Sequence, residues 1–319
     1  MSLRLPVLQR TTVTPAAPGT PSPSDAPATG LGFLPALLPS GVAPAAAKRL
    51  QIPDDPVKLE KRIAYLVTKA THEYDMLAEG DKVMVCMSGG KDSYAMLHFL
   101  QRAQRRAPFN FEIVAVHLNQ GHPGFPLETL EGYLKTCGSP YHIIHENTYD
   151  IVLDKLEPGK TTCSLCSRLR RGILYNAAQQ LGCTKVALGH HRDDIIATFM
   201  LNFFFCGQLK AMPPKLMSDD GKNVVIRPLA FVPEQMIIEL ARQQAWPLIP
   251  CNLCSRQEDL KRSQMEELMK QLDLVYPGAL PSALNALKHA HPRFLLDTDL
   301  YDFNTPATDT NDAELDAFS

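Results

Sequence analysis

A short apolar run that leads directly into a glycine-rich hexapeptide constrains the fold of this chain more than any other feature. Residues 83–87 are all apolar and predict a buried strand, and Ser88-Gly89-Gly90-Lys91-Asp92-Ser93 follows them without a spacer. Residues 94–101 then predict a helix. Two adjacent glycines allow a tight turn that points successive N–H groups at one spot, which the positive N-terminal end of the helix also faces. The sequence therefore predicts a phosphate-binding loop.

The spacing of the hexapeptide decides between several kinds of phosphate-binding loop. It does not match the ATPase P-loop, which places four residues between its glycines, or the dinucleotide fingerprint Gly-x-Gly-x-x-Gly. Ser-Gly-Gly-x-Asp-Ser resembles instead the PP-loop of enzymes that cleave ATP between its α and β phosphates to adenylate a substrate. An ordinary turn between strand and helix is the alternative. The match at every fixed position favours ATP binding by Ser88, Gly89, Gly90, Lys91, Asp92 and Ser93.

Strand and helix patterns alternate along most of the chain. The expected strands are residues 83–87, 111–118, 141–145, 185–189 and 224–226. The expected helices are residues 57–77, 94–103, 127–136, 167–181, 193–205 and 233–243. This alternation predicts an α/β fold, a doubly wound parallel sheet with flanking helices and with ligands beyond the carboxyl ends of the strands. The resemblance of residues 88–93 to the PP-loop implies the PP-loop (adenine nucleotide alpha hydrolase-like) class of this fold. Residues 207–222 interrupt the alternation and predict a long ordered loop.

The two ends of the chain differ in composition from the part between them. Residues 1–50 contain nine prolines and a single acid, so we expect a disordered Pro-rich extension at 1–53. One globular domain is expected at 54–303, and a flexible acidic tail at 304–319. Seven of the 34 acidic residues and none of the 32 basic residues lie at 297–319, so the rest of the chain carries a net charge of +5. That balance is compatible with a nucleic-acid substrate.

Eight cysteines in 319 residues do not form a disulfide framework, and no apolar run approaches a membrane span. No secretory signal is evident either, so we expect a cytoplasmic protein with no membrane partner. Cys163 and Cys166 form one Cys-x-x-Cys pair, and Cys251 and Cys254 form another. A structural zinc site, an iron–sulfur cluster and a redox-active pair at the start of the helix at 167–181 all remain open on spacing alone.

Paired carboxylates follow the expected strand at 185–189. Asp193 and Asp194 therefore reach the same sheet edge as the glycine-rich loop, where they would suit Mg²⁺ or a contact to the substrate. The alternative is helix capping, because acids favour the start of the next helix whatever the ligand. The two roles are compatible. His190 and His191 are expected to orient their neighbours rather than to bind a metal.

Basic residues gather in two places. Arg168, Arg170 and Arg171 follow the first cysteine pair, and a looser group contains Lys210, Lys215, Lys222 and Arg227. Either group could meet phosphates, although scattered surface charge is the commoner explanation of such residues.

Six segments, taken together in their order, resemble the tRNA 2-thiocytidine synthetase family. They are Ser88 to Ser93, Cys163 to Gly172, Leu188 to Asp194, Pro213 to Lys215, Ile226 to Leu229 and Pro250 to Cys254. The resemblance spans residues 57–303 and leaves out both ends of the chain.

This resemblance implies an ATP- and Mg²⁺-dependent enzyme that converts a cytidine at position 32 of the tRNA anticodon loop to 2-thiocytidine. It implies adenylation of the cytidine O2, and sulfur delivery through a [4Fe–4S] cluster held by Cys163, Cys166 and Cys254, with Cys251 an open alternative to Cys254. Asp92, Asp193, Asp194 and Arg170 are the expected catalytic residues. The expected partners are tRNA, a cysteine desulfurase or other sulfur donor, and a second copy of the chain in a homodimer.

Two kinds of rival function remain. Another PP-loop tRNA enzyme would thiolate uridine or attach lysine to cytidine, but the lysine-attaching enzymes do not need the cysteines. Uridine-thiolating enzymes with a three-cysteine cluster typically carry zinc-binding cysteine pairs at both ends, which this chain lacks. A zinc-stabilised RNA-binding module without catalysis would leave the PP-loop unexplained.

Overall fold

The computed structural model of the chain describes residues 50–154, 162–249 and 259–304. Most of the expected N-terminal extension and acidic tail lies outside these ranges, so the domain boundaries stay predictions. Cys251 and Cys254 also lie outside the described residues, as does the side chain of Cys163.

Six strands form one mixed sheet in the order β3-β2-β1-β4-β6-β5. All neighbouring pairs are parallel except β5 with β6, which are antiparallel. The strands are β1 (Lys82–Met87), β2 (Glu112–Asn119), β3 (Tyr141–His145), β4 (Lys185–Ala187), β5 (Lys215–Met217) and β6 (Val224–Ile226). The expectation of a parallel sheet is thus confirmed for five strands, and the sixth adds an antiparallel edge.

Nine α-helices are described around this sheet. They are α1 (Pro56–Glu73), α2 (Lys91–Gln104), α3 (Leu127–Thr136), α4 (Thr148–Asp154), α5 (Thr162–Gln180), α6 (Arg192–Leu201), α7 (Glu234–Gln244), α8 (Asp259–Val275) and α9 (Ala279–Ala286). A π-helix, Asn202–Cys206, continues α6, and a 3₁₀ turn, Pro292–Phe294, follows α9. None of the helices in these ranges combines the length and the apolar content that crossing a bilayer requires.

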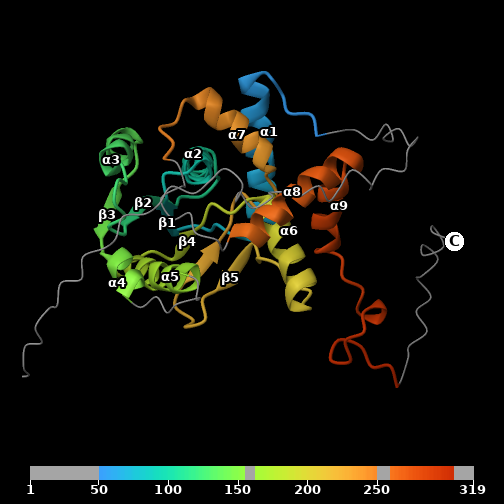
Figure 1. Cartoon of the computed structure of the whole chain (residues 1–319). Coiled ribbons are helices and arrows are strands. Elements are labelled where there is room, and N and C mark those ends of the chain that lie inside the picture. The colour runs from blue at the N-terminus through green and yellow to red at the C-terminus, as the bar shows by residue number, and fades with distance from the viewer. Residues whose placement is uncertain (1–49, 155–161, 250–258, 305–319) are drawn as a thin grey trace, which may run out of the picture. The chain divides into compact units, whose positions relative to one another are not determined.

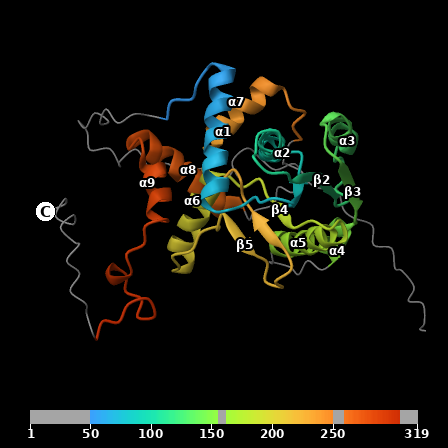
Figure 2. The ribbon, with the colours of Figure 1, turned by 180° about the vertical axis from the view of Figure 1, so that it is seen from behind.

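Successive apolar side chains of β1 point to opposite faces of the sheet, and each face is covered by helices. Val83 and Val85 pack with residues of α1, α2 and α7, whereas Met84 packs with Leu174 and Ala178 of α5. Figures 1 and 2 show α1, α2 and α7 on one side of the strands and α4 and α5 on the other. Strands that are buried on both faces read as continuous apolar runs, which is why residues 83–87 were recognisable.

The register of the central strands brings three carboxyl ends together. Val85 of β1 lies beside Ala187 of β4, which in turn lies beside Ile226 of β6. The loops that begin at Ser88, Leu188 and Arg227 therefore leave the sheet at one edge. A ligand site at this edge is what a parallel α/β sheet predicts.

Several expected elements need correction. The helix expected at 167–181 begins five residues earlier, at Thr162, and runs through Gly172 to Gln180. The segment expected as a loop at 207–222 contains β5, which forms only by pairing with β6. The helix expected at 193–205 becomes a π-helix after Leu201 and ends at Gly207, whose φ is +63°.

The last two long helices were not predicted at all. Met265 and Met269 of α8 and Leu280 of α9 pack against Ile196 and Ala197 of α6 in a separate apolar cluster. The apolar residues of α8, such as Met265, Leu268 and Met269, recur at helical spacing, so a local signal was present and sequence reasoning missed it.

Core packing on the α2 side can be tested with two leucines of opposite exposure. Leu97 in α2 is fully buried, whereas Leu296 is 95% exposed. We expect Leu97→Ala to lower the free energy of unfolding by about 2–5 kcal/mol, because it leaves a cavity beneath the sheet. Leu296→Ala should change it by less than about 0.5 kcal/mol. Urea unfolding of both variants measures the difference, and equal losses would contradict the described core.

Candidate active site at the carboxyl edge of the sheet

Hydrogen bonds within residues 88–93 fix the shape of the glycine-rich loop. The Ser93 hydroxyl donates to the Gly90 carbonyl at 2.8 Å, and the Gly90 N–H donates to Ser88 Oγ at 3.3 Å. Gly90 is the N-cap of α2, and no side chain caps this helix. The first N–H groups of α2 are therefore available to a ligand at the positive end of the helix dipole.

Gly89 is fixed by a contact that only glycine permits. Its φ is +84°, and a Cβ at this position would lie 2.7 Å from Cδ1 of Ile249. The Gly89 carbonyl accepts a hydrogen bond from the Ile249 N–H at 2.9 Å. The segment after α7 thus supports the loop from behind and fixes its shape.

Two carboxylates surround the lysine of the loop. Lys91 Nζ lies 3.1 Å from Asp92 Oδ2 and 2.9 Å from Glu234 Oε1. Burial lowers the pKa of Lys91, but the charges of Asp92 and Glu234 outweigh it and raise the pKa above its ordinary value. Glu234 begins α7, and sequence reasoning missed it because a first-turn glutamate carries no motif.

Asp92 carries an unused acceptor in the middle of the site. Its Oδ1 is buried and accepts no hydrogen bond in the described structure, and His191 Nε2 lies 3.7 Å away, beyond hydrogen-bond distance. Burial raises the pKa of Asp92, against the charges of His191 and Lys91, which lower it. An orphaned carboxylate oxygen at a phosphate-binding loop indicates a missing cationic or hydrogen-bonding ligand.

Asp194 joins the loop after β4 to this site. Its Oδ2 accepts from the His191 N–H at 3.0 Å, while the Asp194 N–H donates to His191 Nδ1 at 3.4 Å, so the two residues form a capping box for α6. Arg262 of α8 forms an ion pair with Asp194. Burial raises the pKa of Asp194, but His191 and Arg262 outweigh it and hold the pKa below its usual range.

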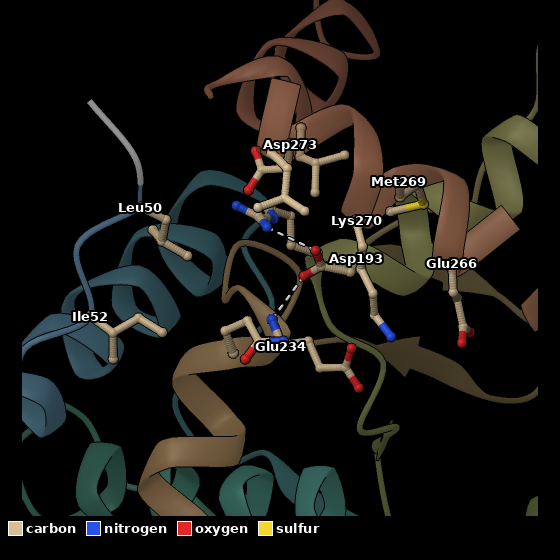
Figure 3. A pocket seen from close by; sticks show the side chains of 12 residues that line it. Leu50, Ile52, Asp193, Glu234, Glu266, Met269, Lys270 and Asp273 are labelled. Carbon is tan, nitrogen blue, oxygen red and sulfur yellow. Dashed lines mark hydrogen bonds and ion pairs between the residues drawn. The ribbon is translucent and has the colours of Figure 1, made fainter. Parts of the chain in front are cut away.

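Asp193 has different partners from Asp194. Its Oδ1 pairs with the Arg192 guanidinium at 2.8 Å, and its Oδ2 accepts from the Glu234 N–H at 2.8 Å. Asp193 lines a pocket of about 340 Å³. Figure 3 shows Asp193 in this pocket together with Leu50 and Ile52 before α1, Glu234 of α7 and residues of α8. The glycine-rich loop does not line this pocket. Asp194 thus has the capping role weighed for the two acids, and both carboxylates approach the His191 ring, Asp193 Oδ2 at 3.9 Å and Asp194 Oδ2 at 3.4 Å.

The cysteine-bearing helix reaches the same edge from the other face of the sheet. Cys166 is a free, half-buried thiol in the second turn of α5, and it donates to Gln120 Oε1 at 3.4 Å. The three-residue spacing to Cys163 places both residues on one face of α5, and Arg170 follows one turn later. Burial raises the pKa of Cys86 in β1 to about 12, against the charge of Arg170, which lies close enough to lower it.

The two groups of basic residues separate in the structure. Arg168, Arg170 and Arg171 are exposed on α5, beside Cys166. Lys215 pairs with Asp75, and Arg227 is 9% exposed, so the looser group is not a single patch of surface charge. No group of three acidic, histidine or cysteine side chains in the described ranges has a geometry that would hold a metal ion by itself.

The shape of the glycine-rich loop yields a prediction with a matched control. Gly138 has a φ of +78° and open space around its Cβ position, whereas Gly89 has a similar φ and meets Ile249. Gly138→Ala should cost about 1–3 kcal/mol of stability from backbone strain. Gly89→Ala should cost about 1–3 kcal/mol more and weaken ATP binding, because Ile249 must move. Urea unfolding and an ATP titration measure both quantities, and equal effects of the two variants would contradict the contact.

Comparisons with known proteins agree with this geometry. The ATP_bind_3 family model, a PP-loop domain, matches residues 57–271. A tRNA-cytidine(32) 2-sulfurtransferase of Paracidovorax citrulli is 56% identical over 246 residues, which cover 77% of this chain and 79% of the relative. The enzyme of the same name from Tolumonas auensis is 54% identical over 78% of this chain and 82% of its own length.

A solved structure is similar as well. The U34-tRNA thiolase NcsA from Methanococcus maripaludis, determined with its [4Fe–4S] cluster, aligns with a TM-score of 0.58 and 25% identity. The alignment covers 74% of this chain and 81% of the thiolase. The expected fold class and the expected family are both confirmed. The chain belongs to the PP-loop family of tRNA-cytidine(32) 2-sulfurtransferases.

Proposed function

We propose that this chain is an ATP-dependent tRNA sulfurtransferase that converts cytidine 32 to 2-thiocytidine. One observation carries the proposal: a phosphate-binding loop with an orphaned carboxylate lies at the same sheet edge as a helix that begins with a Cys-x-x-Cys pair. The names of relatives more than 50% identical over most of the chain point to the same reaction.

The loop at 88–93 would hold the phosphates of ATP. Its uncapped helix start supplies N–H donors, and Lys91 supplies a positive charge that two carboxylates already hold in place. Phosphates carry the same sign as Asp92 and Glu234, so a cation between them is favourable. Mg²⁺ commonly uses one or two carboxylates, with phosphates and waters as its other ligands. Asp92 Oδ1 fits such a ligand, and a dedicated cage of three protein side chains is not required.

The chemistry needs two displacements at the bound cytidine. The O2 atom attacks the α-phosphorus of ATP, so that an O–P bond forms and pyrophosphate leaves with the electrons of the broken P–O bond. Sulfur then attacks C2, and AMP leaves with O2. Adenylation makes O2 a good leaving group, which is why an ATP site and a sulfur site are needed together. Asp92 faces the reacting phosphates, and Asp194 positions it through His191.

Cys163, Cys166 and Cys254 would hold the [4Fe–4S] cluster. Cys166 fits this role because it is a free, half-buried thiol three residues after Cys163 in the same helix. When bound, the cluster supplies iron at which sulfur can be delivered to the substrate. Arg170 lies one helical turn from Cys166 and is exposed, so it can bind the RNA next to the site of sulfur transfer.

Asp193 would act at a distance from the substrate. Its hydrogen bond to the Glu234 backbone ties α6 to α7, and Glu234 in turn holds Lys91. We therefore assign Asp193 to positioning rather than to contact with ATP.

The compartment, the oligomeric state and the sulfur donor are part of the same proposal. We propose a cytoplasmic homodimer that takes sulfur from a cysteine desulfurase or another donor. A globular domain at 54–303, with an extension before it and an acidic tail after it, is proposed to carry the activity. Eight cysteines in 319 residues do not form a disulfide framework, which supports a reducing compartment.

Substitution in the loop should separate ATP use from cluster binding. Lys91→Ala and Asp92→Ala are expected to lower tRNA-dependent pyrophosphate release at least about 100-fold, because each removes a charge that faces the reacting phosphates. Their iron content should equal that of the parent, since the cysteines lie on other segments. Lys135→Ala, which removes an exposed lysine of α3, is the control and should leave both unchanged. Parental pyrophosphate release by Asp92→Ala would refute the assignment of the loop.

The cluster ligands can be tested one at a time. Replacement of Cys163, Cys166 or Cys254 by Ala should abolish the brown colour, the bound iron and thiolation together, while Cys251→Ala should retain most of each. Iron analysis and visible spectra of anaerobic preparations give the readout. Equal losses in all four variants would indicate four thiolate ligands and contradict a three-cysteine site. A colourless, zinc-containing parent protein would instead favour an RNA-binding module.

A further inference from the structure

Arg227 is a buried cation at the carboxyl edge of the sheet. It follows β6 directly, and only 9% of its surface is exposed. No carboxylate in the described ranges lies within ion-pair distance of its guanidinium. Burial lowers the pKa of Arg227, and the more distant charge of Asp194 opposes this only in part. Buried arginines are rarely left without a counter-ion, because removal of a charge from water is costly. The position therefore indicates an anion that belongs to a ligand.

Most of the hydrogen-bond donors of Arg227 are unused. Its Nε donates to His190 Nδ1 at 3.3 Å, and its Nη1 donates to the Pro213 carbonyl at 2.5 Å. The Pro213 carbonyl carries no charge. His190 is neutral as well, because burial and the charge of Arg227 lower its pKa to about 4. A guanidinium has five N–H donors, and the described partners take two of them. The remaining fork suits two oxygens of one phosphate.

A second arginine approaches the same place from α5. Helix α5 packs on β4, which lies beside β6, and Arg227 directly follows β6. Consistent with this placement, burial raises the pKa of Tyr175 in α5, and the charges of Arg171 and Arg227 both act to lower it. Arg171 lies one helical turn before Tyr175 and is exposed, as is Arg168 one turn earlier. The group therefore combines a buried arginine with exposed ones, and it reaches solvent beside the cysteine-bearing helix.

This group is separated from the glycine-rich loop by the segment after β4. His191 approaches Asp92 of the glycine-rich loop to 3.7 Å, whereas its neighbour His190 contacts Arg227. Successive residues in an extended segment point to opposite sides. A phosphate bound by Arg227 is therefore a different one from those held by the loop.

We propose that Arg227 and Arg171 form a second phosphate-binding site, which holds a phosphodiester of the RNA substrate beside α5. This inference rests on the proposed function, because it takes RNA as the substrate. The exposed arginines attract the RNA backbone, and the buried Arg227 fixes one phosphate in position. The reacting base can then enter between the glycine-rich loop and α5.

The test measures tRNA affinity over a range of salt concentrations with the full-length, cluster-loaded protein and unmodified tRNA. Arg227→Gln and Arg171→Gln should each weaken tRNA binding about tenfold. Each should also reduce the slope of log K against log salt by about 0.7–0.9, as expected for the loss of one phosphate contact. Arg227→Lys keeps the charge, so it should keep the parental slope. ATP affinity should stay within about twofold in all three.

Arg242→Gln is the matched control, because it removes an exposed arginine from α7 on the opposite side of the sheet (Figure 2). It should bind tRNA with parental affinity and slope.

Three results would overturn the inference. The first is an Arg227→Gln variant with parental tRNA affinity and slope. The second is a variant that loses ATP affinity instead, which would assign the phosphate to the nucleotide. The third is an Arg171→Gln variant with the parental salt slope. This variant decides the question if Arg227→Gln fails to fold, because the Arg171 side chain is exposed and its replacement does not disturb the core. A parental protein that binds no tRNA would refute the proposed function itself, whereas unchanged variants of a tRNA-binding parent refute only this site.

Discussion

The close approach of two backbone segments at Gly189 and Asp92 holds the active site together. A Cβ at Gly189 would lie 3.1 Å from the carbonyl carbon of Asp92 and 3.3 Å from the Ser93 nitrogen. A larger residue would push the loop after β4 away from the loop after β1. Because glycine lets the two loops touch, His191 and Asp194 reach Asp92, and α6 begins beside the start of α2. The position of each charged group at this edge depends on that contact.

The charges at the edge form a connected network rather than separate pairs. Lys91 and Arg262 pair with Asp92, Glu234 and Asp194, and the His191 ring lies between Asp92 and Asp194, so that four segments of the chain are joined. Such a network holds its side chains in place before any ligand binds, which reduces the cost of ordering them. Arg227 lies at the margin of this network: it contacts His190 and feels the charge of Asp194, but no described carboxylate lies within ion-pair distance of it. The edge is thus neutralised on the α2 side and positive on the α5 side, an arrangement that suits a metal-bound nucleotide on one side and an RNA backbone on the other.

The parts of this site that lie within one strand–loop–helix unit could be predicted from the sequence. Residues 88–93 follow an apolar strand and precede a helix, so local pattern was enough to place them. Glu234 and Arg262 could not be predicted, because each reaches the site through packing between distant helices. The same reason explains β5, which exists by pairing with β6. The helical spacing of apolar residues in α8 was a usable signal that was missed. Arg227 looked like surface charge for a related reason, since burial is a property of the fold and not of the residue. The ligand role of Cys254 stays a prediction, because the residue lies outside the described ranges.

The central claim is that this chain thiolates cytidine 32 of tRNA, and nucleoside mass spectrometry tests it most directly. Bulk tRNA is compared between a strain that lacks the gene, the same strain complemented with the chain, and the parent. The account predicts that 2-thiocytidine disappears in the deletion strain and returns on complementation, while 2-thiouridine derivatives stay constant. An unchanged level of 2-thiocytidine in the deletion strain, or a loss of 2-thiouridine derivatives instead, would contradict it.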